Sequence, residues 1–179
     1  LPSSPGPELA RRLASAEADA FIAEPQWRQQ CAETGPLARV SAQPLVAALL
    51  AEHGNGLLTR LGALLVELAQ SASRLETLVD AGAEAAGSVP HPSVPNKVGI
   101  GTAEAARGRL MHRVSIAAGR VDRYQILAPT EWNFHPRGVV AQGLAAIARS
   151  GAEGPELERL ARLYITAVDP CVEYQLSVS

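Results

Sequence analysis

The chain contains very little lysine, cysteine or aromatic character. Its 179 residues include a single lysine, Lys97, only two cysteines, and 4% aromatic residues. The net charge is −2 and no run of basic residues is present, so neither a nucleic-acid-binding surface nor a polybasic membrane-binding segment is indicated. No apolar stretch of about 18 residues is free of charged or polar breaks, which argues against a transmembrane helix.

The two cysteines, Cys31 and Cys171, are typical of reduced thiols rather than of a disulfide-rich secreted domain. A disulfide between them would require the fold to bring them together. The first residues, Leu1–Pro7, have neither the basic start nor the apolar core of a signal peptide, so we expect a cytoplasmic protein. The length predicts one domain, spanning 1–179, with a substantial hydrophobic core.

Helical periodicity dominates the chain. Apolar residues recur at steps of three and four over 57–81, which predicts a long helix with one apolar stripe, packed in the core and capped by Gly82. Four shorter helices are expected at 7–22, 44–52, 139–150 and 155–168.

The period changes to two in the middle of the chain. Arg109 to Ile116 alternates and places His112 on the more apolar face of a strand, where we expect it to be a core residue. Ala118-Gly119 turns the chain into a second strand over 121–127. The expected fold class is mainly α with a small antiparallel β-sheet (α+β). Its parts are a helical region 7–86, a linker 87–97, a β-hairpin region 98–128, a helical region 137–168 and a C-terminal motif 169–177.

Four separated segments resemble, in the same order, the C-terminal half of nickel–iron hydrogenase large subunits. They are Gly-Pro-Leu-Ala-Arg at 35–39, Glu-Ala-Ala-Arg-Gly-Arg-Leu-Met-His at 104–112, Ala-Pro-Thr-Glu-Trp-Asn at 128–133, and Asp-Pro-Cys at 169–171. The resemblance implies the fold of that half, and it makes Cys171 a metal ligand and Arg107 the arginine that lies over the metal centre.

The family pattern continues with a second cysteine and a closing histidine, and this chain departs from it at both places. Tyr174 stands where the bridging cysteine is expected and Ser177 where the histidine is expected. A tyrosine hydroxyl, with an unperturbed pKa of about 10, does not replace a bridging thiolate. We therefore expect no hydrogen turnover, no nickel and no enzyme activity from this chain.

The remaining pattern is similar to that of HupK-like hydrogenase maturation proteins. That resemblance implies a scaffold that assembles or relays iron carrying cyanide and carbon monoxide, with accessory chaperones and the hydrogenase large-subunit precursor as partners. Two alternatives stay open. One is a metal-free adaptor that mimics the large subunit to recruit partners. The other is a fragment of a catalytic subunit whose missing thiolates come from another chain.

Three side chains are candidate metal ligands: Cys171, Cys31 and His135. Thiolate sulfur suits iron, and Cys31 would supply a second thiolate beside Cys171. Each also has a simpler interpretation. Cys171 would be a small buried apolar residue, Cys31 an ordinary cysteine, and His135 a structural or solvent-facing loop residue.

Two further residues are candidate cofactor-binding groups: Arg107 and Glu33. The guanidinium of Arg107 carries a permanent charge and five donors, which suits an anionic dicyanide group. Its alternative is an ion pair with Glu104 or Glu33. Glu33 follows Cys31 in an irregular segment, and its alternative is a partner of Arg39 or of a helix N-terminus. Trp132 and Asn133 are expected to be architectural.

Overall fold

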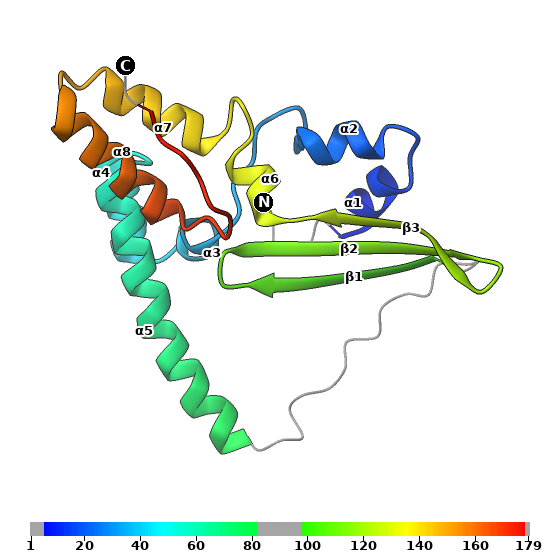
Figure 1. The fold of residues 1–179 in the computed structure, drawn as a ribbon. Coiled ribbons are helices and arrows are strands. Elements are labelled where there is room, and N and C mark those ends of the chain that lie inside the picture. Colours follow the sequence, from blue (N-terminus) through cyan, green and yellow to red (C-terminus); the bar gives the residue numbers. More distant parts are fainter. Residues whose placement is uncertain (1–5, 82–97, 178–179) are drawn as a thin grey trace.

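The structure is a computed structural model that describes residues 6–81 and 98–177 (Figure 1). The described part contains eight helices and one three-stranded sheet. The helices are α1 (Gly6–Leu13), α2 (Ala18–Ala23), α3 (Pro36–Val40), α4 (Pro44–His53), α5 (Leu57–Ala81), α6 (Pro129–Asn133), α7 (Val139–Ala148) and α8 (Gly154–Val168). The strands are β1 (Val98–Ala105), β2 (Gly108–Ala117) and β3 (Arg120–Leu127). The expected linker at 87–97 and the cap at Gly82 lie outside the described residues.

The fold class expected from the sequence is confirmed, with one strand more than predicted. The sheet is antiparallel in the order β1-β2-β3 and its strands follow one another in the chain. β1 was missed because small residues occupy one of its faces, at Gly99, Gly101 and Ala103, and leave little alternation of apolar and polar side chains. Those small residues pair directly with Val114, His112 and Leu110 of β2.

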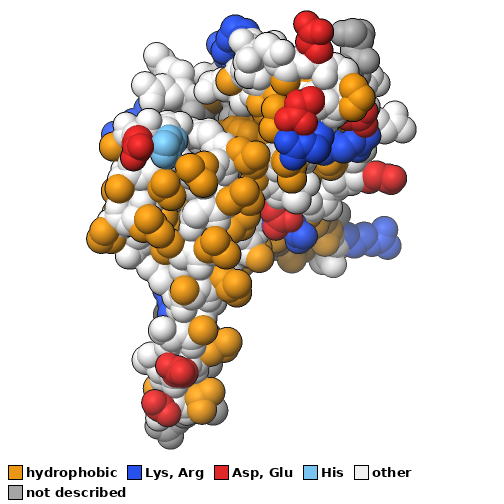
Figure 2. Space-filling model, turned by 90° about the vertical axis from the view of Figure 1, so that its left-hand side faces the viewer, with side chains coloured by type: hydrophobic (Ala, Val, Ile, Leu, Met, Phe, Trp, Pro, Cys, Tyr) orange, Lys and Arg blue, Asp and Glu red, His pale blue; other side chains and the backbone are white. Residues whose placement is uncertain are grey.

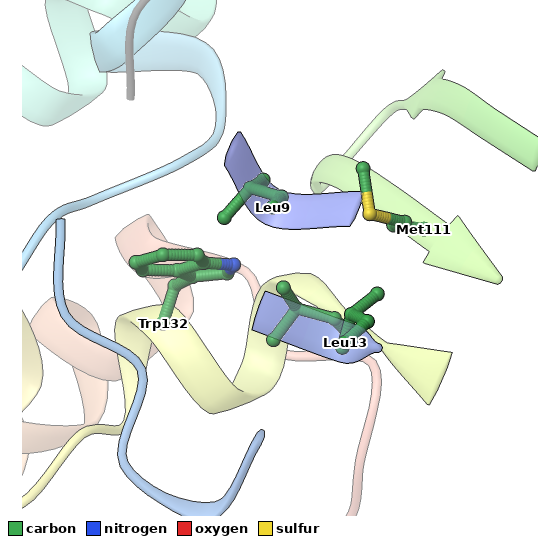
Figure 3. Packing of buried hydrophobic residues seen from close by; sticks show 5 residues of the cluster. Leu9, Leu13, Met111 and Trp132 are labelled. Carbon is green, nitrogen blue, oxygen red and sulfur yellow. The ribbon is translucent and has the colours of Figure 1, made fainter. Parts of the chain in front are cut away.

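One face of the sheet forms the main hydrophobic core, and it is the face that the sequence suggested less strongly. Met111 and Leu127 are buried there, and Met111 lies beside Leu9 and Leu13 of α1 (Figure 3). The core is completed by Leu9, Leu13 and Trp132. The prediction that His112 is a core residue is wrong, because it lies on the other face, only partly buried, with Nδ1 against the Tyr124 hydroxyl. A period of two shows that a strand has two faces but does not say which one the helices cover.

The expected helix over 7–22 is divided into α1 and α2. The Ser15 hydroxyl donates a hydrogen bond to the Arg12 carbonyl oxygen at 2.9 Å, so it competes with the helical backbone pattern at the break. The division lets both short helices pack on the same core, because α1 supplies Leu9 and Leu13, and Phe21 and Ile22 of α2 pack against that cluster. Phe21 of α2 meets Trp132 edge-on, with ring centroids 6.1 Å apart.

Two smaller clusters hold the remaining helices together. In the first, Leu37, Val40 and Val46 of α3 and α4 pack on Ala63 of α5. In the second, α7 packs on α8 through the side chains of Val139, Val140, Tyr164, Ile165 and Val168. The C-terminal segment after α8 returns across this second cluster, with Tyr174 and Leu176 packed against it.

Helix α5 spans the expected residues, but the prediction that its apolar stripe is buried in the core is wrong. Only Thr59, Arg60 and Ala63 of this helix are buried, whereas Leu65 is 67% exposed and Leu68 69% exposed. The C-terminal half of α5 extends away from the rest of the described molecule (Figure 1). Among residues 6–81 and 98–177, no helix is both long enough and apolar enough to cross a membrane.

The contact between α7 and α8 requires a glycine. A Cβ atom on Gly143 would lie 2.0 Å from Cζ of Tyr164, whose ring is buried and whose hydroxyl donates to the Val139 carbonyl at 3.2 Å. We expect Gly143→Ala to lower the free energy of unfolding by about 1–3 kcal/mol, measured by urea denaturation. Gly56→Ala, whose added Cβ would meet its nearest neighbour at 3.5 Å, is the control and should change stability by less than about 1 kcal/mol. Equal effects of the two substitutions would contradict this packing.

Candidate functional site

Three of the family-like segments meet at one tight crossing of the backbone. The buried amide of Asn133, at the end of α6, holds both sides of the Thr34 backbone. Its Oδ1 accepts from the Thr34 N–H at 3.0 Å, and its Nδ2 donates to the Thr34 carbonyl at 2.9 Å. The N–H of Arg109 donates to the Thr34 hydroxyl at 2.8 Å. Asn133 is architectural, as expected, because it satisfies backbone groups that no helix or strand satisfies.

Glycine is required on both sides of this crossing. Gly35 and Gly108 have φ angles of +129° and +133°, which L side chains rarely adopt. A Cβ on Gly108 would lie 2.6 Å from Cγ2 of Thr34, and one on Gly35 would lie 3.2 Å from the Arg107 carbonyl oxygen. The two glycines therefore fix the position of the backbone that carries Arg107.

Arg107 reaches the fourth family-like segment. Its Nε lies 3.2 Å from Oδ1 of Asp169, and both side chains are somewhat less than half exposed. Asp169 caps the end of α8 in a left-handed conformation, with a φ of +56°. Glu104, an expected partner of Arg107, instead contacts Arg109. The ion pair therefore joins the arginine of the second segment to the start of the Asp-Pro-Cys motif, although the sequence did not suggest this partner.

Cys171 lies at the surface beside α6. Its side chain is exposed, and Sγ is 3.6 Å from the Thr130 hydroxyl oxygen. The interpretation of Cys171 as a small buried apolar residue is therefore wrong. An exposed thiol close to an arginine–aspartate pair is accessible to an incoming metal group, and its role as a ligand stays a prediction.

Cys31 is paired with His135, a contact that the sequence did not suggest because 104 residues separate them. Sγ of Cys31 lies 3.3 Å from Nδ1 of His135, and the imidazole is almost completely buried. The backbone N–H of Arg137 also donates to Nδ1, at 3.0 Å. This bond assigns Nδ1 as an acceptor and leaves the proton of a neutral ring on Nε2. Metal binding through Nδ1 would have to displace that backbone donor.

Glu33 is held by a buried arginine rather than left open to a ligand. Arg60 donates to both carboxylate oxygens, at 2.8 and 3.0 Å, and its side chain is only 3% exposed. Its other contacts are to Asn55 and to the hydroxyl of Tyr164. Burial acts to lower the pKa of the Arg60 guanidinium, but the hydrogen bonds and charge of Glu33 outweigh it and the pKa lies above its ordinary value.

Arg39, the expected partner of Glu33, has its own ion pair with Glu67 and donates to two backbone carbonyls before β2. The sequence analysis did not single out Arg60, because attention went to the apolar residues around it in α5. A charged residue among the apolar residues of a helix can indicate a buried ion pair, and that signal could have identified Arg60. The cofactor-binding role of Glu33 stays a prediction.

The structure therefore divides the candidate residues into three places. Arg107 lies with the Asp-Pro-Cys motif, Cys31 with His135, and Glu33 with Arg60. Within the described residues, no group of three or more His, Cys, Asp or Glu side chains is placed to hold a metal ion. Tyr174, at the position where the resemblance implies a bridging cysteine, is partly buried against the cluster of α7 and α8.

Comparison with known proteins shows the family to which this chain belongs. A family model described as nickel-dependent hydrogenase matches residues 58–172. The hydrogenase expression/formation protein HupK of Azotobacter vinelandii is 33% identical over 180 residues, an alignment that covers 96% of this chain and 44% of that protein. The hydrogenase expression/formation protein HoxV of Cupriavidus necator is 37% identical, with 93% of this chain and 43% of that protein covered. The resemblance predicted from the four segments is confirmed.

The fold agrees with the sequence comparison. The structure of the Ni-Fe-Se hydrogenase from D. vulgaris Hildenborough in the reduced state superposes with a TM-score of 0.58 at 28% identity, over 83% of this chain and 36% of that one. This chain spans less than half the length of the curated relatives named above. The residues that the family model matches include α5 except Leu57, the whole sheet, α6 to α8 and the Asp-Pro-Cys motif. The chain belongs to the nickel-dependent hydrogenase family.

Proposed function

We propose that this chain acts in hydrogenase maturation as a scaffold without catalytic activity, which holds or relays an iron unit carrying cyanide and carbon monoxide. The observation that carries the proposal is the state of the C-terminal motif. Cys171 is exposed and Asp169 is paired with Arg107, while the next family ligand position is filled by the packed side chain of Tyr174. The similar proteins named expression/formation proteins support the same role.

The side chains of the exposed Asp-Pro-Cys motif and of Arg107 are chemically suited to hold the iron unit. The thiolate of Cys171 would supply a soft sulfur ligand to iron. The guanidinium of Arg107 would contribute positive charge and hydrogen-bond donors for anionic cyanide groups. A single thiolate with an arginine beside its motif favours transient holding, because a permanent site uses more ligands from the protein.

Release is the step that a scaffold must allow. The iron unit would leave for a precursor that offers more thiolates, and accessory chaperones would deliver it. We place this exchange in the cytoplasm. Nickel has no part in the proposal, because Tyr174 supplies no bridging thiolate.

Infrared spectroscopy tests the proposal. Protein purified anaerobically with its accessory partners should show bands in the cyanide and carbonyl stretching region, and Cys171→Ala should abolish them. Thr130→Val removes the hydroxyl that contacts Cys171 and should keep the bands, because it leaves the thiol in place. Bands that persist unchanged in Cys171→Ala would overturn the assignment of the ligand.

The same experiment examines Cys31 and His135. Because Cys31 is held against a buried imidazole, we expect Cys31→Ala to keep the bands, and their loss would instead place a second thiolate ligand there.

A metal-free adaptor is the second candidate function, and the exposed apolar stripe of α5 favours it. A silent spectrum, together with intact binding of maturation partners by the two cysteine variants, would establish the adaptor.

A further inference from the structure

Helix α5 presents a regular row of apolar side chains outside the described core. The row consists of Leu58, Leu61, Leu65, Leu68, Ala72, Leu75 and Val79. Successive members are three and four residues apart in strict alternation, which is the spacing of the a and d positions of a heptad repeat. In the part of the chain that the structure describes, its leucines and its valine are between 43% and 77% exposed. We call this row the α5 seam.

The α5 seam faces away from the contacts that α5 already makes. The buried residues of the helix, Thr59, Arg60 and Ala63, contribute to its packing on α3, α4 and α8 and fall at other heptad positions. The space-filling view shows apolar side chains along the length of the projecting helix, continuing onto the body above it (Figure 2). An apolar row of this length is typical of a buried contact surface.

The spacing indicates what kind of element covers the seam. A period of 3.5 residues keeps side chains aligned along another helix, where each one inserts between four residues of its neighbour. A strand or an irregular segment has no matching repeat. The spacing therefore favours an α-helix with its own apolar row.

The positions beside the seam favour a bundle over a simple pair of identical helices. On one side lie Leu64 and Leu78, which widen the apolar surface. On the other side lie Ala69 and Gly62, of which Gly62 already faces Leu49 of α4. Glu76 is the one charged side chain at these flanking positions of the described helix. Two-stranded coiled coils use complementary charges there to choose partner and register, whereas a wider apolar face is typical of a helix inside a larger bundle.

The lengths of the relatives point to the source of that helix. HupK and HoxV match this chain over 96% and 93% of its residues, yet these alignments cover only 44% and 43% of the two relatives. We propose that the α5 seam packs against an amphipathic helix in the polypeptide that corresponds to the remaining part of those relatives, carried on the same chain or on a separate one. This inference does not depend on the proposed iron-holding function.

Photo-crosslinking tests the proposal. The chain would be produced together with the corresponding polypeptide from the same genome, with benzoylphenylalanine at position 68 of the seam or at position 73 on the polar face. Position 68 should give crosslinks to a helix of that polypeptide, located by mass spectrometry of proteolytic fragments, and position 73 should give at least tenfold fewer. A product of two copies of this chain, a crosslink to another protein, or no crosslink at position 68 would each overturn the proposal.

Charge substitutions provide the matched control. Leu65→Glu combined with Leu68→Glu should reduce the crosslink yield from position 75, also in the seam, by at least tenfold. Ser73→Glu combined with Thr77→Glu places two glutamates on the polar face of the same helix and should leave that yield unchanged. All four positions are exposed, so both double variants should retain the helical circular dichroism of the original chain. A yield that survives Leu65→Glu and Leu68→Glu would overturn the proposal even if crosslinks form.

Discussion

Substituting Gly108 by alanine should lower the free energy of unfolding by about 2–6 kcal/mol, because the substitution carries two separate costs. The φ angle of +133° is strained for a residue with a side chain, which costs about 1–3 kcal/mol. The added Cβ would also lie 2.6 Å from Cγ2 and 2.7 Å from Oγ1 of Thr34, and such overpacking costs about 1–3 kcal/mol. Thr34 has no free direction to move in, since Asn133 holds its backbone on both sides.

Gly101→Ala is the matched control in the same sheet. A Cβ at Gly101 of β1 would meet nothing within 4 Å, so denaturant unfolding should show a change of less than about 1 kcal/mol. The loss in Gly108→Ala should be accompanied by a weaker cyanide and carbonyl signal, because the crossing positions Arg107. If Gly108→Ala matched Gly101→Ala in stability, the close crossing of the two backbone segments would be refuted.

Arg60→Met should lower the free energy of unfolding by about 3–5 kcal/mol, the range expected when one partner of a buried ion pair is removed. Methionine retains much of the side-chain length but leaves the largely buried Glu33 without its two charged donors. The Tyr164 hydroxyl loses a partner as well, and so does the Asn55 amide oxygen. The variant therefore removes the contacts through which Arg60 of α5 links the segment before α3 to α8.

A double variant shows whether the cost arises from the loss of the ion pair. Glu33→Gln combined with Arg60→Met also removes the carboxylate charge, and we expect it to be at least about 1 kcal/mol more stable than Arg60→Met alone. Arg159→Met provides the second control, because it removes one member of a solvent-exposed pair with Glu156 and should leave the urea midpoint unchanged. Additive effects of the two changes in the double variant would show that Arg60 stabilises the fold through contacts other than its pair with Glu33.

The sequence predicted those parts of the fold that depend on long, regular patterns. The 25 residues of α5 repeat their apolar spacing over many turns, and the helix was placed correctly. The same pattern does not show whether the apolar stripe of α5 packs against another part of this chain, because periodicity shows only that one face of the helix is apolar. β1 escaped prediction because its glycines and alanine leave almost no periodic signal.

The candidate site was predictable only in part. The family-like segments identified Arg107 and the Asp-Pro-Cys motif, and the fold brings them together through Asp169. Cys31 contacts His135, which is 104 residues away in the sequence. Glu33 contacts Arg60, which is 27 residues away. Such pairs are set by how the helices pack, and neither residue of a pair carries a local signal of its partner.

The packing of Tyr174 has a consequence for any attempt to build a fuller metal site here. Its partly buried ring packs against the apolar cluster beneath the returning C-terminal segment. Replacing it with cysteine would introduce a thiol but remove much of the side chain that anchors that segment, so stability would fall. A thiol at this position therefore needs a second, compensating change in the cluster, and a single substitution would gain a ligand only by weakening the fold.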